Sequence, residues 1–292
     1  MAKKVIVIGD VMLDVIVKPT QPLAPTSDTP AHVRVGRGGA GANVAVALAK
    51  GGHDVTYVGA VGSDVAGEEF ALDLLRAGVT PKLEKFDGST GVVVAVIASD
   101  GQRAMMTDRG VNAELTLEAV LSALEAPFDH LHVSGYTLLD EDTRQLGTTV
   151  LERAQSLGAS TSVDVCSVGP LARVTPTVFL EAARSSSMLL ANEEEALLLS
   201  GCVEVGEAAS VLSRDFEEVL ITRGREGVLA VADSQTWSEE SLSVEVLDTT
   251  GAGDAASGAY IAARLDGLSV AESLTLAMQA AAAVVRALGS SG

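Results

Sequence analysis

Two aspartates enclose two threonines and three small residues near the end of the chain, in the segment Asp248–Asp254 (Asp-Thr-Thr-Gly-Ala-Gly-Asp). An apolar helical run, Ala255–Leu265, follows this segment. A Gly-Ala-Gly helix start leaves backbone N–H groups uncovered, and the helix dipole favours an anion such as a phosphoryl group there. Asp254, at the edge of these amides, could accept a proton from a substrate hydroxyl. The segment therefore predicts a phosphoryl-transfer site without a Walker-type lysine loop; an Asp-capped helix after a turn is the plainer alternative.

Acids and glycines also follow other predicted strands. Gly9-Asp10-x-x-x-Asp14 comes directly after the apolar strand Val5–Ile8, where open α/β sheets bind their ligands. Its two carboxylates could accept hydrogen bonds from vicinal hydroxyl groups, or could simply cap a helix or face solvent. Gly36–Gly41 fits G-x-G-x-x-G, but it follows a short strand after a Pro-rich loop rather than the first strand of a βαβ unit. A Rossmann oxidoreductase is therefore kept only as an alternative.

Two arginines, Arg103 and Arg109, lie on or beside a predicted hairpin. In an acidic protein, arginines beside a cleft suggest contact with an anion, although ion pairing at the surface explains them equally well. If both line the site, the acceptor carries a phosphate or a carboxylate. If neither does, the acceptor is a neutral sugar or nucleoside.

The composition excludes several classes of partner. The chain has 292 residues, a formal net charge of −19 and a pI near 4.5. This acidity argues against nucleic acid and anionic membranes as partners, because both require a basic surface. The sequence shows neither a signal peptide nor an apolar run long enough to span a bilayer. Cys166 and Cys202 have no metal-site spacing and are expected as buried, reduced thiols, so we predict a soluble, cytoplasmic protein.

Strands and helices alternate along most of the chain, which predicts an α/β fold: a doubly wound, mainly parallel sheet flanked by helices. Two stretches contain strands only, and the second includes a hairpin turn at Ser99–Gln102. We expect these stretches to form a small β-sheet lid. The predicted division is a large α/β domain of residues 1–14, 37–88 and 110–292 and a discontinuous lid of residues 15–36 and 89–109.

The Asp248–Asp254 segment resembles the signature of the ribokinase-like (PfkB-type) sugar and nucleoside kinases. Four further segments resemble elements of this family, in the same order along the chain: Gly38-Gly39-x-Gly-x-Asn43, Gly62-x-Asp64-x-x-Gly67, Asn192-x-x-Glu195 and Thr222-x-Gly224-x-x-Gly227. The resemblance spans nearly the whole chain. It implies a ribokinase-like fold and ATP-dependent transfer of the γ-phosphoryl group to a primary hydroxyl of a small carbohydrate.

The resemblance also implies roles for individual residues. Asp254 would be the catalytic base, and the amides of Gly251, Ala252 and Gly253 would form the anion hole. The acceptor would contact Asp10, Asp14, Gly38, Gly39 and Asn43, with Arg103 and Arg109 as further candidates. ATP would contact Asn192, Thr222, Arg223, Gly224, Gly227, Asp248 and Thr250, and Glu195 would organise Mg²⁺. Gly62–Gly67 would be a structural turn between a strand and a helix.

Two residues depart from the family pattern. Ala40 stands where ribokinases proper have Lys, so the sequence does not specify ribose as the acceptor. Cys166 stands where many family sugar kinases have the Asn of an Asp-x-Asn element that begins here at Asp164. The contribution of that Asn is therefore not carried over to this chain.

The acceptor stays open between a sugar and a nucleoside. The low aromatic content, 3%, leaves few rings to stack on a base and favours a sugar. A non-catalytic ligand-binding protein of the same fold is a further alternative, which an intact Asp254 argues against. The resemblance also allows for K⁺, bound by carbonyl groups of Asp248 and Thr250, and an exposed face of the lid would allow a homodimer.

Overall fold

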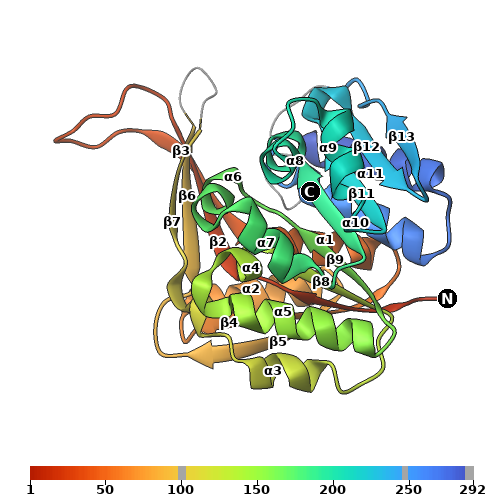
Figure 1. Cartoon of the computed structure of the whole chain (residues 1–292). Helices are drawn as coiled ribbons and strands as arrows, with labels where there is room; N and C mark the ends of the chain where they lie inside the picture. Colours follow the sequence, from red (N-terminus) through yellow and green to blue (C-terminus); the bar gives the residue numbers. More distant parts are fainter. Residues whose placement is uncertain (98–102, 245–248, 287–292) are drawn as a thin grey trace.

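A nine-stranded sheet forms the centre of the computed structural model, which describes residues 1–97, 103–244 and 249–286 (Figure 1). Its strands are β1 (Lys4–Ile8), β4 (Asp54–Gly62), β5 (Val79–Phe86), β8 (His130–Ser134), β9 (Ser160–Asp164), β10 (Met188–Asn192), β11 (Glu218–Thr222), β12 (Val228–Ala232) and β13 (Gln235–Glu239). The strand order is β13-β12-β11-β10-β9-β8-β1-β4-β5. All neighbours from β5 to β11 are parallel, whereas the pairs β11–β12 and β12–β13 are antiparallel.

Helices cover both faces of this sheet. They are α1 (Ala40–Lys50), α2 (Val65–Arg76), α3 (Leu117–Ala123), α4 (Gly135–Leu139), α5 (Glu141–Ser156), α6 (Val168–Val174), α7 (Pro176–Ala183), α8 (Glu193–Ser200), α9 (Val205–Leu212), α10 (Ala252–Leu265) and α11 (Val270–Val285), with 3-10 turns η1 (Gly110–Glu114) and η2 (Gly224–Glu226). Successive side chains of β1 enter different cores. Val5 and Val7 pack with residues of α1 and α10, whereas Ile6 and Ile8 pack with residues of α5 and α7. The predicted doubly wound fold is confirmed.

A second, four-stranded sheet lies to one side of the large one (Figure 1). It contains β2 (Met12–Pro19), β3 (Ala31–Gly38), β6 (Gly91–Ile97) and β7 (Arg103–Asp108), in the order β3-β2-β6-β7. It is built from the two strand-only stretches, but β2 begins at Met12 and β3 ends at Gly38, so the sheet extends beyond the predicted residues 15–36. The predicted hairpin turn at Ser99–Gln102 lies outside the described residues.

Side chains fix the points where the chain passes between the two sheets. Asn112 accepts a hydrogen bond from the backbone N–H of Val11 (2.7 Å) and donates to the carbonyl groups of Val11 (2.9 Å) and Arg109 (2.7 Å). Asp64 caps α2 through the N–H of Gly67 and also accepts from the N–H of Thr90 (2.7 Å). The Gly62–Gly67 turn therefore connects a strand to a helix, as the sequence suggests, and also holds the start of β6.

Two strands at the edges of the large sheet are not predicted by the sequence pattern. β5 contains Pro81 and alternates exposed Thr80 and Lys82 with buried or half-buried residues, which is typical of an edge strand rather than of a buried parallel one. β13 is almost fully exposed. In the described part of the chain, no helix has the length and apolar character needed to cross a bilayer.

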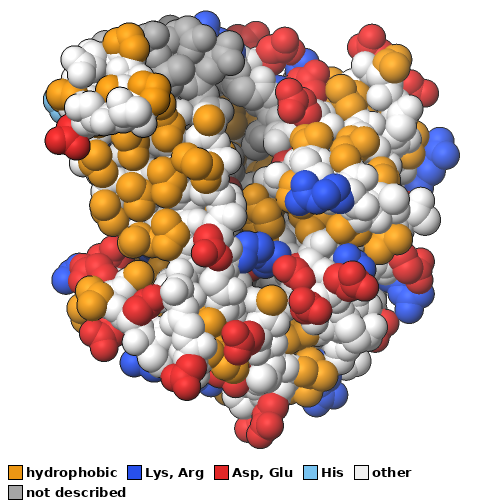
Figure 2. All heavy atoms as spheres, turned by 90° about the vertical axis from the view of Figure 1, so that its left-hand side faces the viewer, with side chains coloured by type: hydrophobic (Ala, Val, Ile, Leu, Met, Phe, Trp, Pro, Cys, Tyr) orange, Lys and Arg blue, Asp and Glu red, His pale blue; other side chains and the backbone are white. Residues whose placement is uncertain are grey.

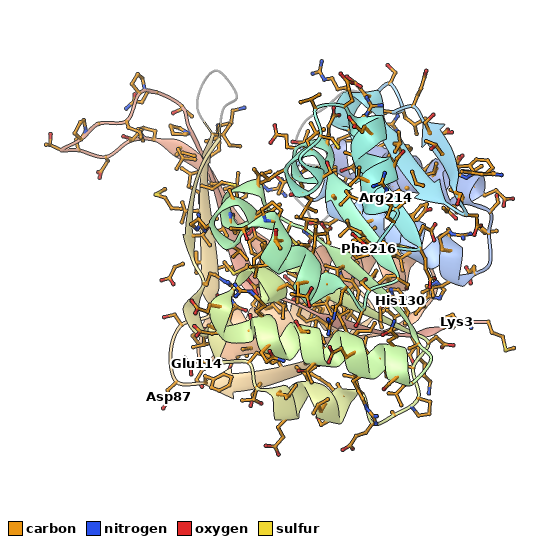
Figure 3. The ribbon with its side chains drawn as sticks, viewed as in Figure 1. Lys3, Asp87, Glu114, His130, Arg214 and Phe216 are labelled. Carbon is orange, nitrogen blue, oxygen red and sulfur yellow. The ribbon has the colours of Figure 1, made fainter. Side chains whose placement is uncertain are left out.

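A pair of buried histidines lies in the middle of the large sheet, and Figure 3 labels His130 among the strands. The ring nitrogens of His130 lie 2.8 Å from the hydroxyls of both Ser160 and Ser162, and Nδ1 of His132 lies 2.9 Å from Ser162 Oγ. Burial lowers the pKa of each histidine to about 3, so both are neutral near neutral pH. They belong to the structure of the sheet, as their lack of ligand spacing suggests.

These histidines should make the fold sensitive to acid. Between pH 6.5 and pH 3 the unfolded chain binds protons at both rings and the folded chain does not, so stability falls as the pH falls. Between pH 7 and pH 5, the free energy of unfolding of His130→Asn/His132→Asn, measured with urea, should decrease by less than that of the wild type. We expect the difference to be about 2 kcal/mol per histidine. His32→Asn, on the exposed side of β3, is the matched control and should behave as wild type. An equal loss in the double variant and the wild type would contradict the expectation.

Candidate active site

The predicted site residues gather at one edge of the large sheet. Asp10 follows β1, Asp164 ends β9, Asn192 ends β10 and Thr222 ends β11. These strands are parallel, and Asn192 lies opposite Thr222 in the register of β10 and β11. Parallel strands bring their carboxyl ends to a common edge, where α/β proteins bind ligands. The segments before α1 and α10 reach the same edge.

Asp254 lies in the first turn of α10, next to the glycine-rich helix start. Gly251 caps this helix in a left-handed conformation, and no heavy atom lies within 4 Å of the place where Gly253 would carry a Cβ atom. Oδ2 of Asp254 accepts a hydrogen bond from Nδ2 of Asn43 (2.8 Å). Burial raises the pKa of Asp254 to about 6, while the Asn43 hydrogen bond and the charge of Arg37 act against the increase. At neutral pH this carboxylate is therefore mostly ionised and able to accept a proton, and its pKa lies close to the pH.

Close backbone approaches explain the glycines of the Gly38–Asn43 block. A Cβ atom on Gly38 would lie 2.0 Å from Oδ1 of Asp14, so the Asp14 carboxylate occupies the space above this glycine. Gly39 has φ +92°, and a Cβ atom there would lie 2.5 Å from the carbonyl oxygen of Asp10. Larger residues would push the start of α1 away from β1 and β2. The glycines thus bring Asp14 and Asn43 to the same side of the site.

Arg109 is committed to carboxylates of the protein. Its guanidinium lies 2.9 Å from the carboxylate of Asp10, forms a second ion pair with Asp140, and stands 5.8 Å from the ring centroid of Tyr136. Burial raises the pKa of Asp10, and the charge of Arg109 opposes this effect. Asp10 and Arg109 therefore neutralise each other's charge in an ion pair within the protein. Arg103 begins β7, but its side chain is outside the described part of the structure.

On the other side of Asp254, Asn192 and Glu195 form a capping box at the start of α8. Asn192 Oδ1 accepts from the N–H of Glu195 (2.9 Å), and Oε2 of Glu195 accepts from the N–H of Asn192 (2.8 Å). Burial raises the pKa of Glu195 to about 7, and the nearby carboxylate of Asp254 adds to the increase. Burial also raises the pKa of Asp164, and the charges of Glu195 and Asp254 raise it further. Three acids thus share this end of the site.

The turn after β11 is tight and carries paired charges. The N–H of Arg223 donates to the carbonyl oxygen of Gly227 (2.8 Å), and Gly224 and Gly227 both have positive φ. Nε of Arg223 lies 3.4 Å from the carboxylate of Glu193, and its guanidinium also pairs with Glu226. Arg223, expected to add charge near a phosphate, is therefore partly neutralised. Thr250 precedes α10, and Asp248 lies outside the described residues.

The chain bends sharply after β9, where Cys166 replaces the family Asn. Cys166 has φ +71°, and its N–H donates to Oδ1 of Asp164 (3.1 Å). Its Sγ lies 3.4 Å from Oγ of Ser134, and burial raises the pKa of the thiol. Both Cys166 and Cys202 are free, as expected, but each is half-buried rather than fully buried.

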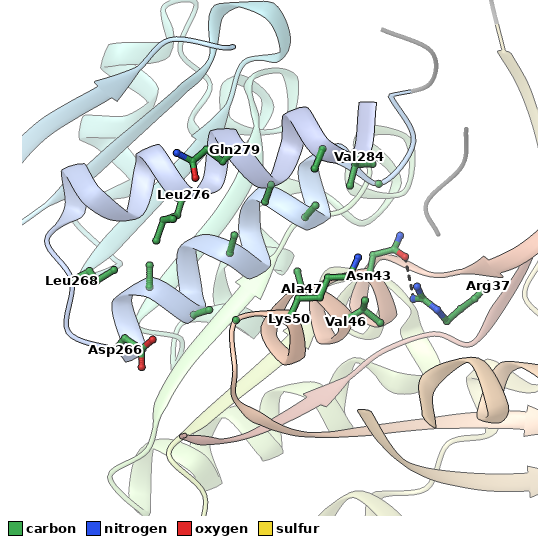
Figure 4. Close-up of a pocket in the computed structure, with 18 residues that line it drawn as sticks. Arg37, Asn43, Val46, Ala47, Lys50, Asp266, Leu268, Leu276, Gln279 and Val284 are labelled. Carbon is green, nitrogen blue, oxygen red and sulfur yellow. Dashed lines mark hydrogen bonds between the residues drawn. The ribbon is translucent and has the colours of Figure 1, made fainter. Parts of the chain in front are cut away.

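Arg37 also lies in this site, although its position in the sequence does not predict a role there. It ends the exposed part of β3, is itself only 7% exposed, and its Nη1 donates to Oδ1 of Asn43 (3.2 Å; Figure 4). The sequence gives no local signal for it, because a cation at a strand end, like the exposed Arg34 on the same strand, is ordinarily solvated. The burial of Arg37 follows only from the tertiary structure.

A groove of about 470 Å³ leads away from Asn43 and Gly251, between α1, α10 and α11 (Figure 4). Most of its lining is aliphatic, including Val46, Ala259, Leu276 and Val284. The acidic and amide groups of the site stand at one end of this groove.

Comparisons with known proteins agree over the length of the chain. The chain is 28% identical over 278 residues to a probable fructokinase-4 of Arabidopsis thaliana, covering 90% of this chain and 83% of that protein. It is 27% identical over 292 residues to a ribokinase of Bacillus subtilis, covering 99% and 95%. The solved adenosine kinase of Sinorhizobium meliloti has the same fold, with a TM-score of 0.90, 24% identity and coverage of 99% and 96%.

The model of the pfkB family of carbohydrate kinases matches residues 2–292. Since this match includes both sheets and every segment of the site, the chain belongs to the pfkB family of carbohydrate kinases, phosphotransferases that act on alcohol groups.

Proposed function

We propose that this protein transfers the γ-phosphoryl group of ATP to a primary hydroxyl of a small, neutral carbohydrate. One observation carries the proposal: Asn43 holds Asp254 in the first turn of α10, directly after the helix start formed by Gly251, Ala252 and Gly253, where no heavy atom lies within 4 Å of the place of a Cβ atom on Gly253. A base and an anion site at one helix start are what in-line phosphoryl transfer to an alcohol requires.

One group of residues positions the acceptor, and another catalyses the transfer. Asp14, Gly38, Gly39 and Asn43 position the acceptor sugar, and Asp254 removes the proton from its hydroxyl as the oxygen attacks the γ-phosphorus. The amides at the start of α10 stabilise the charge on the transferring group. Asp10 and Arg109 hold each other beside the acceptor and shape its site. The second sheet, which carries Asp14, closes over the acceptor and excludes water.

Asn192, Thr222, Arg223, Gly224, Gly227 and Thr250, with Asp248, are the candidates for contact with ATP. Mg²⁺ fits the acidic side of this region, because the charges of Glu195 and Asp254 raise the pKa of Asp164, the charge of Asp254 raises the pKa of Glu195, and a cation would relieve that repulsion. In the described residues no three His, Cys, Asp or Glu side chains form a ready metal set. Mg²⁺ typically needs only one or two carboxylates besides phosphates and water, so Glu195 would hold it through its waters. When bound, Mg²⁺ neutralises charge on the phosphates.

The charges favour a neutral acceptor over an anionic one. Arg109 already forms ion pairs with Asp10 and Asp140. Arg37 donates a hydrogen bond to Asn43, and its charge interacts with the carboxylates of Asp14 and Asp254. A sugar acid or sugar phosphate would add negative charge to a site that is rich in carboxylates. Carbonyl groups of Asp248 and Thr250 are candidates for K⁺. We place the reaction in the cytoplasm, where ATP is supplied.

Aromatic residues favour a sugar over a nucleoside. Tyr57, Tyr260, Phe70, Phe179 and Phe216 are buried in the cores. Tyr136 is the ring beside the acceptor residues, and it faces the guanidinium of Arg109. A base would therefore find little to stack on, and nucleoside phosphorylation is the alternative that the first assay tests.

We expect ADP release with ATP and Mg²⁺ on neutral pentoses or hexoses, and at least about 10-fold lower kcat/KM on sugar acids, sugar phosphates and nucleosides. Asp254→Asn should lower kcat by about 10³-fold and leave ATP affinity within about twofold, because the base acts only in the chemical step. Asp266→Asn, at the other end of α10, is the matched control. Near wild-type turnover by Asp254→Asn would exclude Asp254 as the base, and turnover of nucleosides alone would reverse the sugar assignment.

The second sheet is also a candidate surface for a homodimer. Hydrophobic side chains gather on the face of it that Figure 2 shows, and Val33, Val35 and Met106, which the strand register places on one face, are all more than half exposed. Two such faces could cover each other, since large apolar patches on soluble proteins commonly mark interfaces. Because this sheet also carries Asp14, dimerisation would stabilise the acceptor side of the site.

Val35→Asp should convert a dimer into a monomer in size-exclusion chromatography with light scattering, because a charge would be buried unpaired in the interface. Val203→Asp, at a still more exposed valine far along the chain after α8, should leave the mass unchanged. A monomeric wild type at about 10 μM would remove the dimer from the proposal while leaving the kinase assignment intact.

A further inference from the structure

We infer that Arg37 is a positioning residue for phosphoryl transfer: it fixes the side-chain amide of Asn43 so that its NH₂ group, and not its oxygen, faces Asp254. The inference rests on the proposed role of Asp254 as the base. It adds a residue from the second sheet to the machinery that prepares this base.

The three residues form a continuous hydrogen-bonded row. Nη1 of Arg37 donates to Oδ1 of Asn43 (3.2 Å), and Nδ2 of Asn43 donates to Oδ2 of Asp254 (2.8 Å; Figure 4 shows the first contact). Each residue comes from a different element, namely β3, α1 and α10. The row therefore forms only when the second sheet is seated against the large one.

The donors and acceptors of this row allow one orientation of the amide. A guanidinium can only donate hydrogen bonds, and an ionised carboxylate can only accept them. An Asn between the two must turn its oxygen to Arg37 and its NH₂ to Asp254. Without Arg37, the amide could turn over and accept a hydrogen bond from a protonated Asp254, which would favour the form that cannot act as a base.

Burying a guanidinium is costly unless nearby groups compensate for it. Burial lowers the pKa of Arg37, and Tyr57 and carboxylates that include Asp14 and Asp254 oppose this effect. Lys or Arg side chains at solvated strand ends do not carry this cost. The position of Arg37 is therefore best explained by what it does for its partners.

Burial disfavours the ionised form of Asp254, and further acids lie near it. Asp164 at the end of β9 and Glu195 in α8 are acids that lie close enough to interact with it, and Cys166 follows Asp164. The row from Arg37 brings positive charge from the opposite side. Ionisation of Asp254 at neutral pH thus depends on Arg37 and Asn43 together.

The test compares the pH dependence of kcat/KM for the acceptor in Arg37→Met, Arg37→Lys and wild type. In Arg37→Met we expect the acid limb to move up by about one pH unit, so that activity is about fivefold lower at pH 6 and within about twofold of wild type at pH 9. Arg37→Lys keeps a donor-only group and should restore most of the difference. Arg34→Met, on the exposed side of the same strand, should match wild type.

A loss by the same factor at every pH, or no rescue by Lys, would assign Arg37 a purely structural role and overturn the inference. Thermal unfolding of Arg37→Met distinguishes a misfolded variant from an active-site effect. The titration of Asp254, followed by NMR with ¹³C-carboxyl aspartate and assigned with Asp254→Asn, needs no activity. An unchanged titration in Arg37→Met overturns the inference even if the kinase assay succeeds. A wild type without turnover overturns the proposed function, while the NMR shift still decides the role of Arg37.

Discussion

Crowded carboxylates at one edge of a parallel sheet are the constraint on which the site depends. Five acids reach this edge in a protein whose net charge is already −19: Asp10, Asp14, Asp164, Glu195 and Asp254. Ionised carboxylates in partly buried positions destabilise a fold unless each has its own donors. Arg109 forms an ion pair with Asp10. The N–H of Cys166 donates a hydrogen bond to Asp164, the N–H of Asn192 donates to Glu195, and the side-chain amide of Asn43 donates to Asp254. Each donor comes from a different segment of the chain, so the fold of this edge determines how its carboxylates are stabilised.

The same groups stabilise the fold and prepare the chemistry. The capping box of Asn192 and Glu195 satisfies the start of α8, and it also keeps a buried carboxylate next to the proposed phosphate region. Asp64 caps α2 and at the same time holds the start of β6 through Thr90. A structural reading and a functional reading of such residues are therefore not exclusive, because a helix start supplies both a cap and a field that favours anions.

Local chemistry decided what the sequence could predict. The Asp248–Asp254 segment and the glycines near Asn43 carry their meaning in short-range backbone geometry, so the residues around Asp254 and the doubly wound fold were within reach. The ion pairs of Arg109 were not, because Asp10 and Asp140 are far from it in sequence and meet it only in the folded chain. Arg37 was missed for the same reason, since nothing local shows that it is buried. β5 was missed because an edge strand with a proline lacks the apolar pattern of its neighbours.

The short connections between the two sheets have a consequence for how binding and reaction are coupled. Asp14 belongs to the second sheet, whereas Asn43 and Asp254 are anchored in helices of the large one. Asn112 ties both Val11 and Arg109 at the base of the second sheet. A small rotation about this base would carry Asp14 towards or away from the helices, and Arg37 would move with it, since both belong to the second sheet. Because Arg37 donates to Asn43 and Asn43 donates to Asp254, the position of the second sheet is coupled to the hydrogen bonds around Asp254.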